Sequence, residues 1–290
     1  MLGETLRNYV QLTKPGIMVL LLLEALTAMI VAARDSIHIL SLLWLLLAGA
    51  LASGGSAAIN HYLERDKDMM MSRTENRPVA TGKISPSKAL AFGVTLIALS
   101  LLVSYVLLNA VATLMILLGA LSYIFLYTMY LKPRTEWNIV IGGVAGVFPA
   151  LAGWAAATGT VQLPAVFIGA LVFLWTPAHF WGLSVKYKED YARSGYPMIS
   201  VVKTERQVIN WIVVSSVLLL PFSLLPLAIP SLGRYDLIYY GAATLMGLVF
   251  VMIDIKMLKD PTPDNAFRAF IVSLPYLFVI FGAMIASSIV

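Results

Sequence analysis

Long apolar runs, separated by charged, polar or proline-containing segments, dominate this chain. A membrane-spanning helix needs about 20 consecutive, mostly apolar residues. The strands of a membrane barrel are shorter and alternate apolar with polar residues, so continuously apolar runs of this length predict helices. We therefore expect an all-α polytopic membrane protein in which residues 1–290 form a single domain, one bundle of nine transmembrane helices. The predicted spans are 15–33, 38–61, 88–108, 110–130, 138–157, 162–185, 208–230, 236–256 and 267–289.

Composition supports a lipid environment. Hydrophobic residues make up 60% of the 290 residues and charged residues only 12%, whereas soluble domains carry roughly 25% charged residues. Cysteine is absent, which excludes disulfides and thiolate chemistry. The net charge of +5 does not indicate a nucleic-acid partner, because the basic residues lie between apolar runs and not on the face of a soluble domain.

Lysine and arginine are divided very unequally between the two sides of the predicted bundle. Of the 20 basic residues, 18 lie on the side of the N-terminus, and Arg34 and Arg234 lie on the other. Basic loops favour the cytoplasmic side, so we expect a multi-pass protein of the cell (cytoplasmic) membrane with a cytoplasmic N-terminus and an external C-terminus. The two longest charged segments, 62–87 and 186–207, share the cytoplasmic side, where we expect the chemistry.

The first charged segment follows the second predicted span. If the helix continues through it, Asn60, Glu64 and Asp68 lie one turn apart on one face. Two carboxylates on one face repel unless a cation neutralises them, and Mg²⁺ bound to oxygen ligands and phosphate is a common solution. A solvated helix end with internally paired charges is the alternative. Arg73 and Arg77 favour the first interpretation, because two guanidinium groups suit a diphosphate.

The second charged segment lies four spans later on the same side. It contains Asp190, with Lys186 one turn before it and Glu189 as a further carboxylate. We expect the two segments to face each other across the bundle. A plain cluster of charges beside the membrane is the alternative.

These patterns resemble the UbiA superfamily of intramembrane prenyltransferases. The resemblance rests on the Asn-x-x-x-acid-x-Asp-x-Asp pattern from Asn60 and the Arg-Thr-x-x-Arg-Pro run at 73–78. Other runs are similar to the protoheme IX farnesyltransferase (heme O synthase) branch of that superfamily. They are 12–15, 127–135, 138–143, Trp-Thr-Pro-Ala-His-Phe-Trp at 175–181, and 190–198.

The resemblance implies transfer of a farnesyl group from farnesyl diphosphate to a vinyl group of heme B, with addition of water, to give heme O. It implies Mg²⁺ as the cofactor, and heme A synthase or terminal-oxidase assembly factors as candidate partners. The catalytic residues carried over are Asn60, Glu64, Asp68 and Asp190, of which Glu64, Asp68 and Asp190 are the metal ligands; the diphosphate-binding residues are Arg73, Arg77, Lys132, Lys14 and Lys186. The superfamily commonly has Asp at positions 64 and 186, so the number of Mg²⁺ ions stays open.

His179 is the candidate heme-binding residue. It lies in the sixth span beside Pro177, which is expected to kink the helix, and imidazole is a common axial ligand of heme iron. A buried histidine hydrogen-bonded to a neighbouring helix is the alternative. Glu24, in the first span, is either functional or a protonated bundle-facing group. Asp254 is expected to pair with Lys256 or Lys259 near the membrane surface.

Two other functions remain open. A prenyltransferase for a quinone precursor or an archaeal lipid precursor would share both acidic segments, but is not expected to share the motif around His179. An ion-coupled transporter also places acidic residues in a helical bundle, although near the midplane at broken helices.

Overall fold

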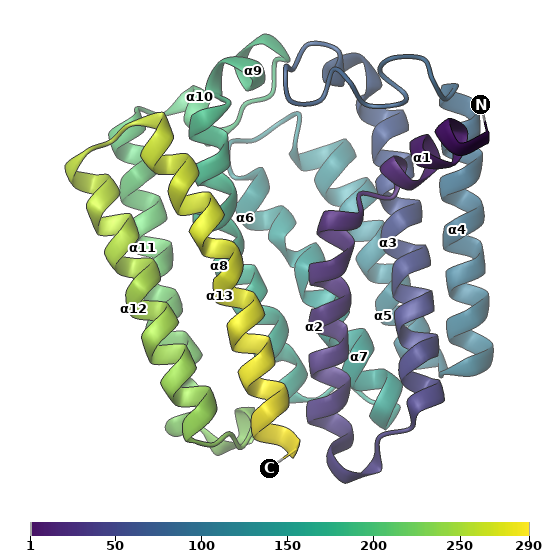
Figure 1. The fold of residues 1–290 in the computed structure, drawn as a ribbon, viewed down its shortest axis with the longest axis vertical. Coiled ribbons are helices and arrows are strands. Elements are labelled where there is room, and N and C mark those ends of the chain that lie inside the picture. Colours follow the sequence, from purple (N-terminus) through teal and green to yellow (C-terminus); the bar gives the residue numbers. More distant parts are fainter. Residues whose placement is uncertain (1, 290) are drawn as a thin grey trace.

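The computed structural model describes residues 2–289, and nine helical segments within that range are long and apolar enough to cross a membrane (Figure 1). These segments confirm the predicted spans to within about four residues, except that the helix of the second span continues seven residues past the predicted end, to Asp68. They are Pro15–Ala33 (α2), Ile39–Asp68 (α3), Pro86–Leu107 (α4), Ala110–Leu131 (α5 and η2), Asn138–Thr158 (α6, η3 and α7), Leu163–Lys186 (α8), Glu205–Leu227 (α11 and η4), Leu237–Lys259 (α12) and Pro263–Ile289 (α13).

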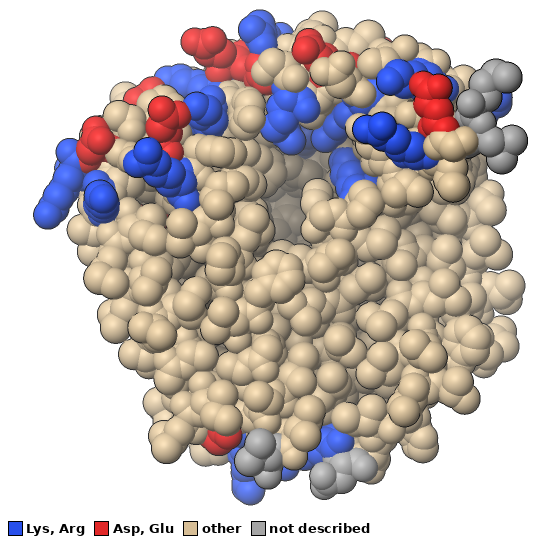
Figure 2. All heavy atoms as spheres, in the orientation of Figure 1, with Lys and Arg blue, Asp and Glu red and all other residues tan. Residues whose placement is uncertain are grey.

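Short helices complete the chain at both ends of the bundle. The helices α1 (Leu2–Leu12), α9 (Lys188–Arg193) and α10 (Ile199–Val202) lie at one end, and η1 (Arg34–Ser36) and η5 (Pro230–Leu232) lie at the other. Figure 2 shows that Lys, Arg, Asp and Glu gather over the end with α1 and α9, which we call the charged end. The last spanning helix, α13, finishes at the opposite end (Figure 1).

Three predicted spans are less regular than the apolar pattern implies, and the seventh span ends in the 3₁₀ turn η4 (Leu225–Leu227). The fourth begins as α5 (Ala110–Leu121) and continues as the π-helix η2 (Ser122–Leu131). The fifth consists of α6 (Asn138–Gly142), the 3₁₀ turn η3 (Gly143–Val147) and α7 (Phe148–Thr158). A 3.6-residue periodicity does not distinguish these helix types, and π-helical turns occur frequently at functional sites.

Helix ends follow local sequence rules. Proline occupies the first turn of α2, α4 and α8, where its missing N–H has no helical partner. Thr204 and Gln207 form a capping box at the start of α11, and the Asp236 side chain accepts hydrogen bonds from the first turn of α12.

Small residues allow neighbouring helices to approach closely. A Cβ atom on Gly55 in α3 would lie 2.6 Å from the Gly93 carbonyl oxygen in α4, and one on Gly153 in α7 would lie 2.0 Å from the Ala25 carbonyl oxygen in α2. Lipid supplies little hydrophobic force between helices, so this backbone contact is a main source of their packing energy.

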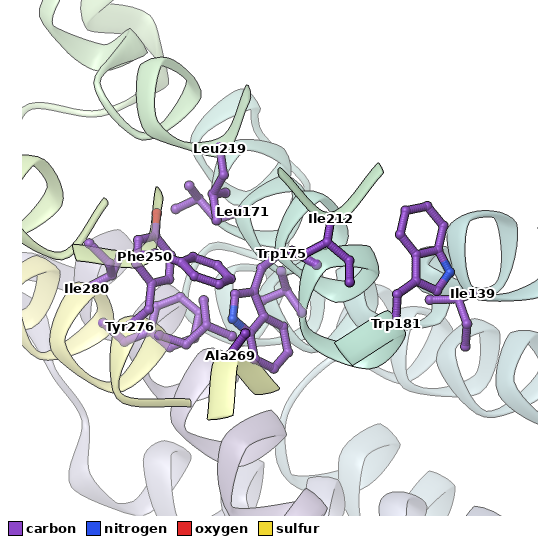
Figure 3. Packing of buried hydrophobic residues seen from close by; sticks show 14 of the residues in the cluster. Ile139, Leu171, Trp175, Trp181, Ile212, Leu219, Phe250, Ala269, Tyr276 and Ile280 are labelled. Carbon is purple, nitrogen blue, oxygen red and sulfur yellow. The ribbon is translucent and has the colours of Figure 1, made fainter. Parts of the chain in front are cut away.

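A large apolar cluster joins α8 to the C-terminal helices. Figure 3 shows Trp175 of α8 among Phe250 of α12 and Ala269 and Tyr276 of α13. The Trp175 indole Nε1–H also donates to the Ser273 carbonyl oxygen at 2.9 Å. These contacts fix α8 and α13 relative to each other.

We predict that Gly153→Ala destabilises the protein by about 1–3 kcal/mol, because its new Cβ forces α7 away from the backbone of α2. Chemical unfolding in detergent measures this loss. Gly241→Ala in α12 is the matched control, since a Cβ there meets nothing within 4 Å. Equal stabilities of the two variants would contradict the proposed close packing.

Candidate active site

The C-terminal third of α3 carries the first predicted group. Helix α3 continues to Asp68, which confirms that Asn60, Glu64 and Asp68 lie on one helix at successive turns. All three side chains are buried, with exposed fractions of 1%, 4% and 2%. The sequence did not predict that these side chains, next to a polar loop, would be buried. Because burial makes an unpaired charge costly, every charge in the group must be compensated.

Three cations from outside α3 lie against this group, two of them from segments distant in the chain. Lys132 Nζ lies 2.5 Å from Glu64 Oε1, and Arg77 Nη1 lies 2.8 Å from both carboxylate oxygens of Asp68. The same Nη1 is 3.9 Å from Glu64 Oε2, so a single cationic group lies near both carboxylates. Lys14 Nζ donates to Asn60 Oδ1 at 2.5 Å.

Lys14 is held in an unusual backbone conformation. It lies between α1 and α2 with φ 49°, in the left-handed region that non-glycine residues seldom adopt. Burial, together with the nearby Arg77 charge, lowers the pKa of Lys14 to about 7. An anion bound among these groups would offset both effects, because an opposite charge favours the protonated amine.

Aromatic side chains surround the cations. Lys132 follows the π-helical η2 and lies 4.6 Å from the centre of the Tyr196 ring. Tyr196 also hydrogen-bonds to Glu64, and burial followed by the Glu64 charge raises the pKa of Tyr196 well above its ordinary value. Tyr123 lies 3.5 Å from Lys14 Nζ and stacks on Tyr127. The sequence indicated Tyr127 and Tyr196 only through the runs 127–135 and 190–198, without a role, and it did not single out Tyr123.

Asp190 contacts the loop after α3. Its Oδ2 accepts from Ser72 Oγ at 2.8 Å and from the Arg73 backbone N–H at 3.3 Å, and Arg193 pairs with the other oxygen. Burial alone would raise the pKa of Asp190, but the bonds from Ser72 and Arg73 outweigh it and lower that pKa. Asp190 thereby connects the two charged segments, which confirms the prediction that they face each other.

Two predicted diphosphate-binding residues lie apart from the group around α3. Lys186 Nζ bonds to Asp264 Oδ1 at 2.6 Å, and the Asp264 side chain is 75% exposed. The Arg73 guanidinium contacts the Tyr191 hydroxyl at 3.5 Å and lies over the Tyr187 ring. Within residues 2–289, no three acidic or histidine side chains are close enough to share a metal ion.

A hollow opens just below the charged rim. In Figure 2 it falls between the upper parts of α2 and α13 as Figure 1 draws them. Lys14 immediately precedes α2, so the cationic group lies beside the edge of the bundle that this hollow reaches.

His179 is enclosed between two rings. Its imidazole stacks on Trp175 at 4.0 Å and on Phe270 at 4.3 Å between ring centres. The Ser273 hydroxyl donates its proton to the Phe270 carbonyl oxygen at 2.7 Å and therefore accepts from His179 Nδ1–H at 2.6 Å. We infer the tautomer with a proton on Nδ1, which leaves a free lone pair on Nε2.

Two further carboxyl groups are buried within the membrane. Glu24 in α2 is fully buried, with neither oxygen bonded to a side chain. Asp254 in α12 is also fully buried, so the expected pairing with Lys256 or Lys259 at the surface is wrong. The helix rotates this side chain toward the neighbouring helices, which the apolar pattern did not reveal.

The fold and this site define a polytopic helical membrane protein with a buried cluster of carboxylates and cations at one end of its bundle. The model of the UbiA prenyltransferase family matches residues 21–282. This chain belongs to that family, and it is a membrane-embedded prenyltransferase.

Relatives of nearly the same length resemble the chain closely. Protoheme IX farnesyltransferase 1 of Cenarchaeum symbiosum (strain A) is 41% identical over 283 residues, which cover 96% of this chain and 94% of that protein. Protoheme IX farnesyltransferase of Symbiobacterium thermophilum is 42% identical over 284 residues, with coverages of 97% and 94%.

Solved structures share the fold at low sequence identity. A structure of digeranylgeranylglyceryl phosphate synthase superimposes with a TM-score of 0.75 at 18% identity and covers 99% of both chains. A UbiA homologue from Archaeoglobus fulgidus, bound to GPP and Mg²⁺, superimposes with a TM-score of 0.69 at 16% identity and covers 96% of this chain and 99% of its own.

We predict that Lys132→Met destabilises the protein by about 3 kcal/mol, because it leaves the buried Glu64 carboxylate without its closest cation. Adding Glu64→Gln to this variant should recover most of the loss. Denaturant unfolding of both variants measures the difference. A double variant no more stable than Lys132→Met would refute the pairing.

Proposed function

We propose that this enzyme transfers the farnesyl group of farnesyl diphosphate to a vinyl group of heme B and so makes heme O. The convergence of Lys14, Arg77 and Lys132 on α3 carries the proposal, since it provides a site for a diphosphate. The two relatives described above, both named protoheme IX farnesyltransferase, support heme as the acceptor.

The three cations have a direct chemical role in this reaction. The bond between the farnesyl C1 atom and the diphosphate oxygen breaks, and the diphosphate leaves with both bonding electrons. Lys14, Arg77 and Lys132 stabilise that developing negative charge, and Arg73 extends the cationic surface toward the second segment. Preorganised cations in a pocket closed to water are effective because little reorganisation is needed.

The oxygen-rich group on α3 fits Mg²⁺. Glu64 and Asp68 supply hard carboxylate oxygens, and the Arg77 Nη1 atom already lies near both of them as a cation. We propose that Glu64 and Asp68 hold Mg²⁺, with Asn60 beside them. Asp190 is too far from this pair in the described structure to share the same ion, so it would become a further ligand only after the second segment moves toward α3. Bound Mg²⁺ would neutralise charge on the departing diphosphate.

His179 is proposed to bind heme through its Nε2 atom. A histidine that ligates iron with one ring nitrogen usually donates its other N–H to a fixed acceptor, and Ser273 is that acceptor here. Trp175 and Phe270 hold the ring in place by stacking.

The acceptor step forms one carbon–carbon bond and adds one water. The vinyl carbon of heme attacks the farnesyl C1, water supplies a hydroxyl to the adjacent carbon, and a proton is released. The tyrosine walls beside the cations keep bulk water from the farnesyl group before this step.

We also propose that the charged end faces the cytoplasm, that the host bilayer is the cell membrane, that residues 1–290 act as one domain, and that heme A synthase or oxidase assembly factors receive the product.

The experiment that tests the function is incubation of purified protein in lipid with heme B, farnesyl diphosphate and Mg²⁺. We expect a product heavier than heme B by a farnesyl group plus water, and none after EDTA treatment. Turnover with phenolic acceptors or glyceryl phosphates, but not with heme, would reject the heme assignment and keep the prenyl-transfer chemistry.

Asp68→Asn should reduce kcat/KM by about 100-fold or more, because it removes one charge from the Mg²⁺ site. Asp66→Asn is the matched control two residues away. Asp66 is 70% exposed and pairs only with Arg65, so its variant should retain activity within about twofold. Similar losses in both variants would contradict the metal assignment.

His179→Ala should abolish the change in the heme absorption spectrum on binding while leaving farnesyl diphosphate affinity unchanged. Ser273→Ala should weaken heme binding by about tenfold, because it removes the acceptor that fixes the imidazole. Absorption titration with heme and calorimetry with farnesyl diphosphate separate the two effects. An unchanged heme spectrum in His179→Ala would reject ligation.

A further inference from the structure

A second cationic pocket lies at the end of the bundle opposite the charged end. It has a volume of about 330 Å³ and includes Arg34, Arg234 and Trp154 among its lining residues. Arg34 and Arg234 are the two basic residues that the sequence assigns to this side of the membrane. None of the described residues that line the pocket is acidic.

Arg34 has a backbone conformation that needs a compensating interaction. Lys14 and Arg34 are the two non-glycine residues with positive φ in the described chain, at 49° and 45°. They flank the 19 residues of α2 and lie about 30 Å apart at a rise of 1.5 Å per residue. Such strained residues cluster at binding sites, and Lys14 already lies in one.

Unpartnered donors surround the two arginines. The Trp154 side chain is 6% exposed, and its indole Nε1–H is buried without a hydrogen-bond partner. The Tyr235 hydroxyl is also buried without a partner. Burial raises the pKa of Tyr235, and Arg34 lies close enough to oppose that rise. Asp236, the described carboxylate two residues after Arg234, accepts hydrogen bonds from the first turn of α12 and does not line the pocket. Two guanidinium groups and the Trp154 N–H in the lining, with the Tyr235 hydroxyl beside it, form a binding surface for an anion.

We propose that this pocket binds the phosphate group of an anionic membrane lipid. Arg34 follows the end of α2 and Arg234 precedes the start of α12, at the level where spans end and lipid phosphates lie. Both arginines are exposed to that layer, and paired guanidinium groups suit phosphate oxygens better than single charges do.

A phosphate bound in this pocket would contact helices from both the N-terminal and the C-terminal parts of the chain. Its contacts come from the end of α2, from α7, from the start of α8 at Gln162, and from the connection before α12. At the charged end, ion pairs such as Lys132 with Glu64 connect distant segments instead. The lipid therefore stabilises the fold without touching the site of prenyl transfer.

The test is thermal unfolding of the full protein in uncharged detergent, with phosphatidylglycerol, phosphatidylcholine or inorganic phosphate added. We expect phosphatidylglycerol to raise the unfolding midpoint of the wild type and phosphatidylcholine not to. Arg34→Gln with Arg234→Gln should weaken the apparent phosphatidylglycerol affinity by about tenfold per arginine. A rise with inorganic phosphate as well would identify free phosphate as an alternative source of the same ligand.

Arg7→Gln with Arg268→Gln is the matched control. It removes two exposed charges at the charged end and should respond to phosphatidylglycerol like the wild type. Trp154→Phe keeps the aromatic packing but removes the unpartnered N–H, so it should weaken lipid binding severalfold while the protein remains folded. An equal response to phosphatidylglycerol in all variants, or none in the wild type, would overturn the proposal. Heme O formation reports on the other site and is expected to remain in every variant.

Discussion

The buried charge on α3 is the constraint on which the rest of the charged end depends. Glu64 and Asp68 are almost completely enclosed, and an unpaired carboxylate in such surroundings costs several kcal/mol. Their partners must therefore come from other segments. Lys132, which follows η2, pairs with Glu64, and Arg77, in the loop after α3, pairs with Asp68. These two ion pairs determine how the end of η2 and the loop after α3 are positioned against α3.

The same arrangement prepares the enzyme for its substrate. In the proposed reaction, the cations that neutralise Glu64 and Asp68 would receive a diphosphate once Mg²⁺ binds the two carboxylates. Lys14, whose pKa burial lowers to about 7, regains full charge beside an anion. On this proposal, charge compensation and catalysis use the same side chains, so changes to these residues are expected to affect both stability and turnover.

The proposed heme site around His179 is held by apolar packing, and not by paired charges. His179 is positioned by apolar packing, since Trp175 is anchored in the cluster of α8, α12 and α13 and stacks on the imidazole. Ser273 hydrogen-bonds to the ring Nδ1 and, with its proton donated to the Phe270 carbonyl, favours the inferred Nδ1–H tautomer. Rigid helices hold His179, whereas loops contribute most of the proposed diphosphate site.

The sequence by itself determined the nine spans, their charged connections, and the shared face of Asn60, Glu64 and Asp68, because these follow from local hydrophobicity and helical periodicity. It also singled out His179 through its motif. Tertiary structure decided that Asp190 fastens the loop after α3, that Lys186 pairs with Asp264, and that Asp254 is buried. These outcomes depend on helix rotation and on contacts between residues far apart in the chain, which no local pattern encodes.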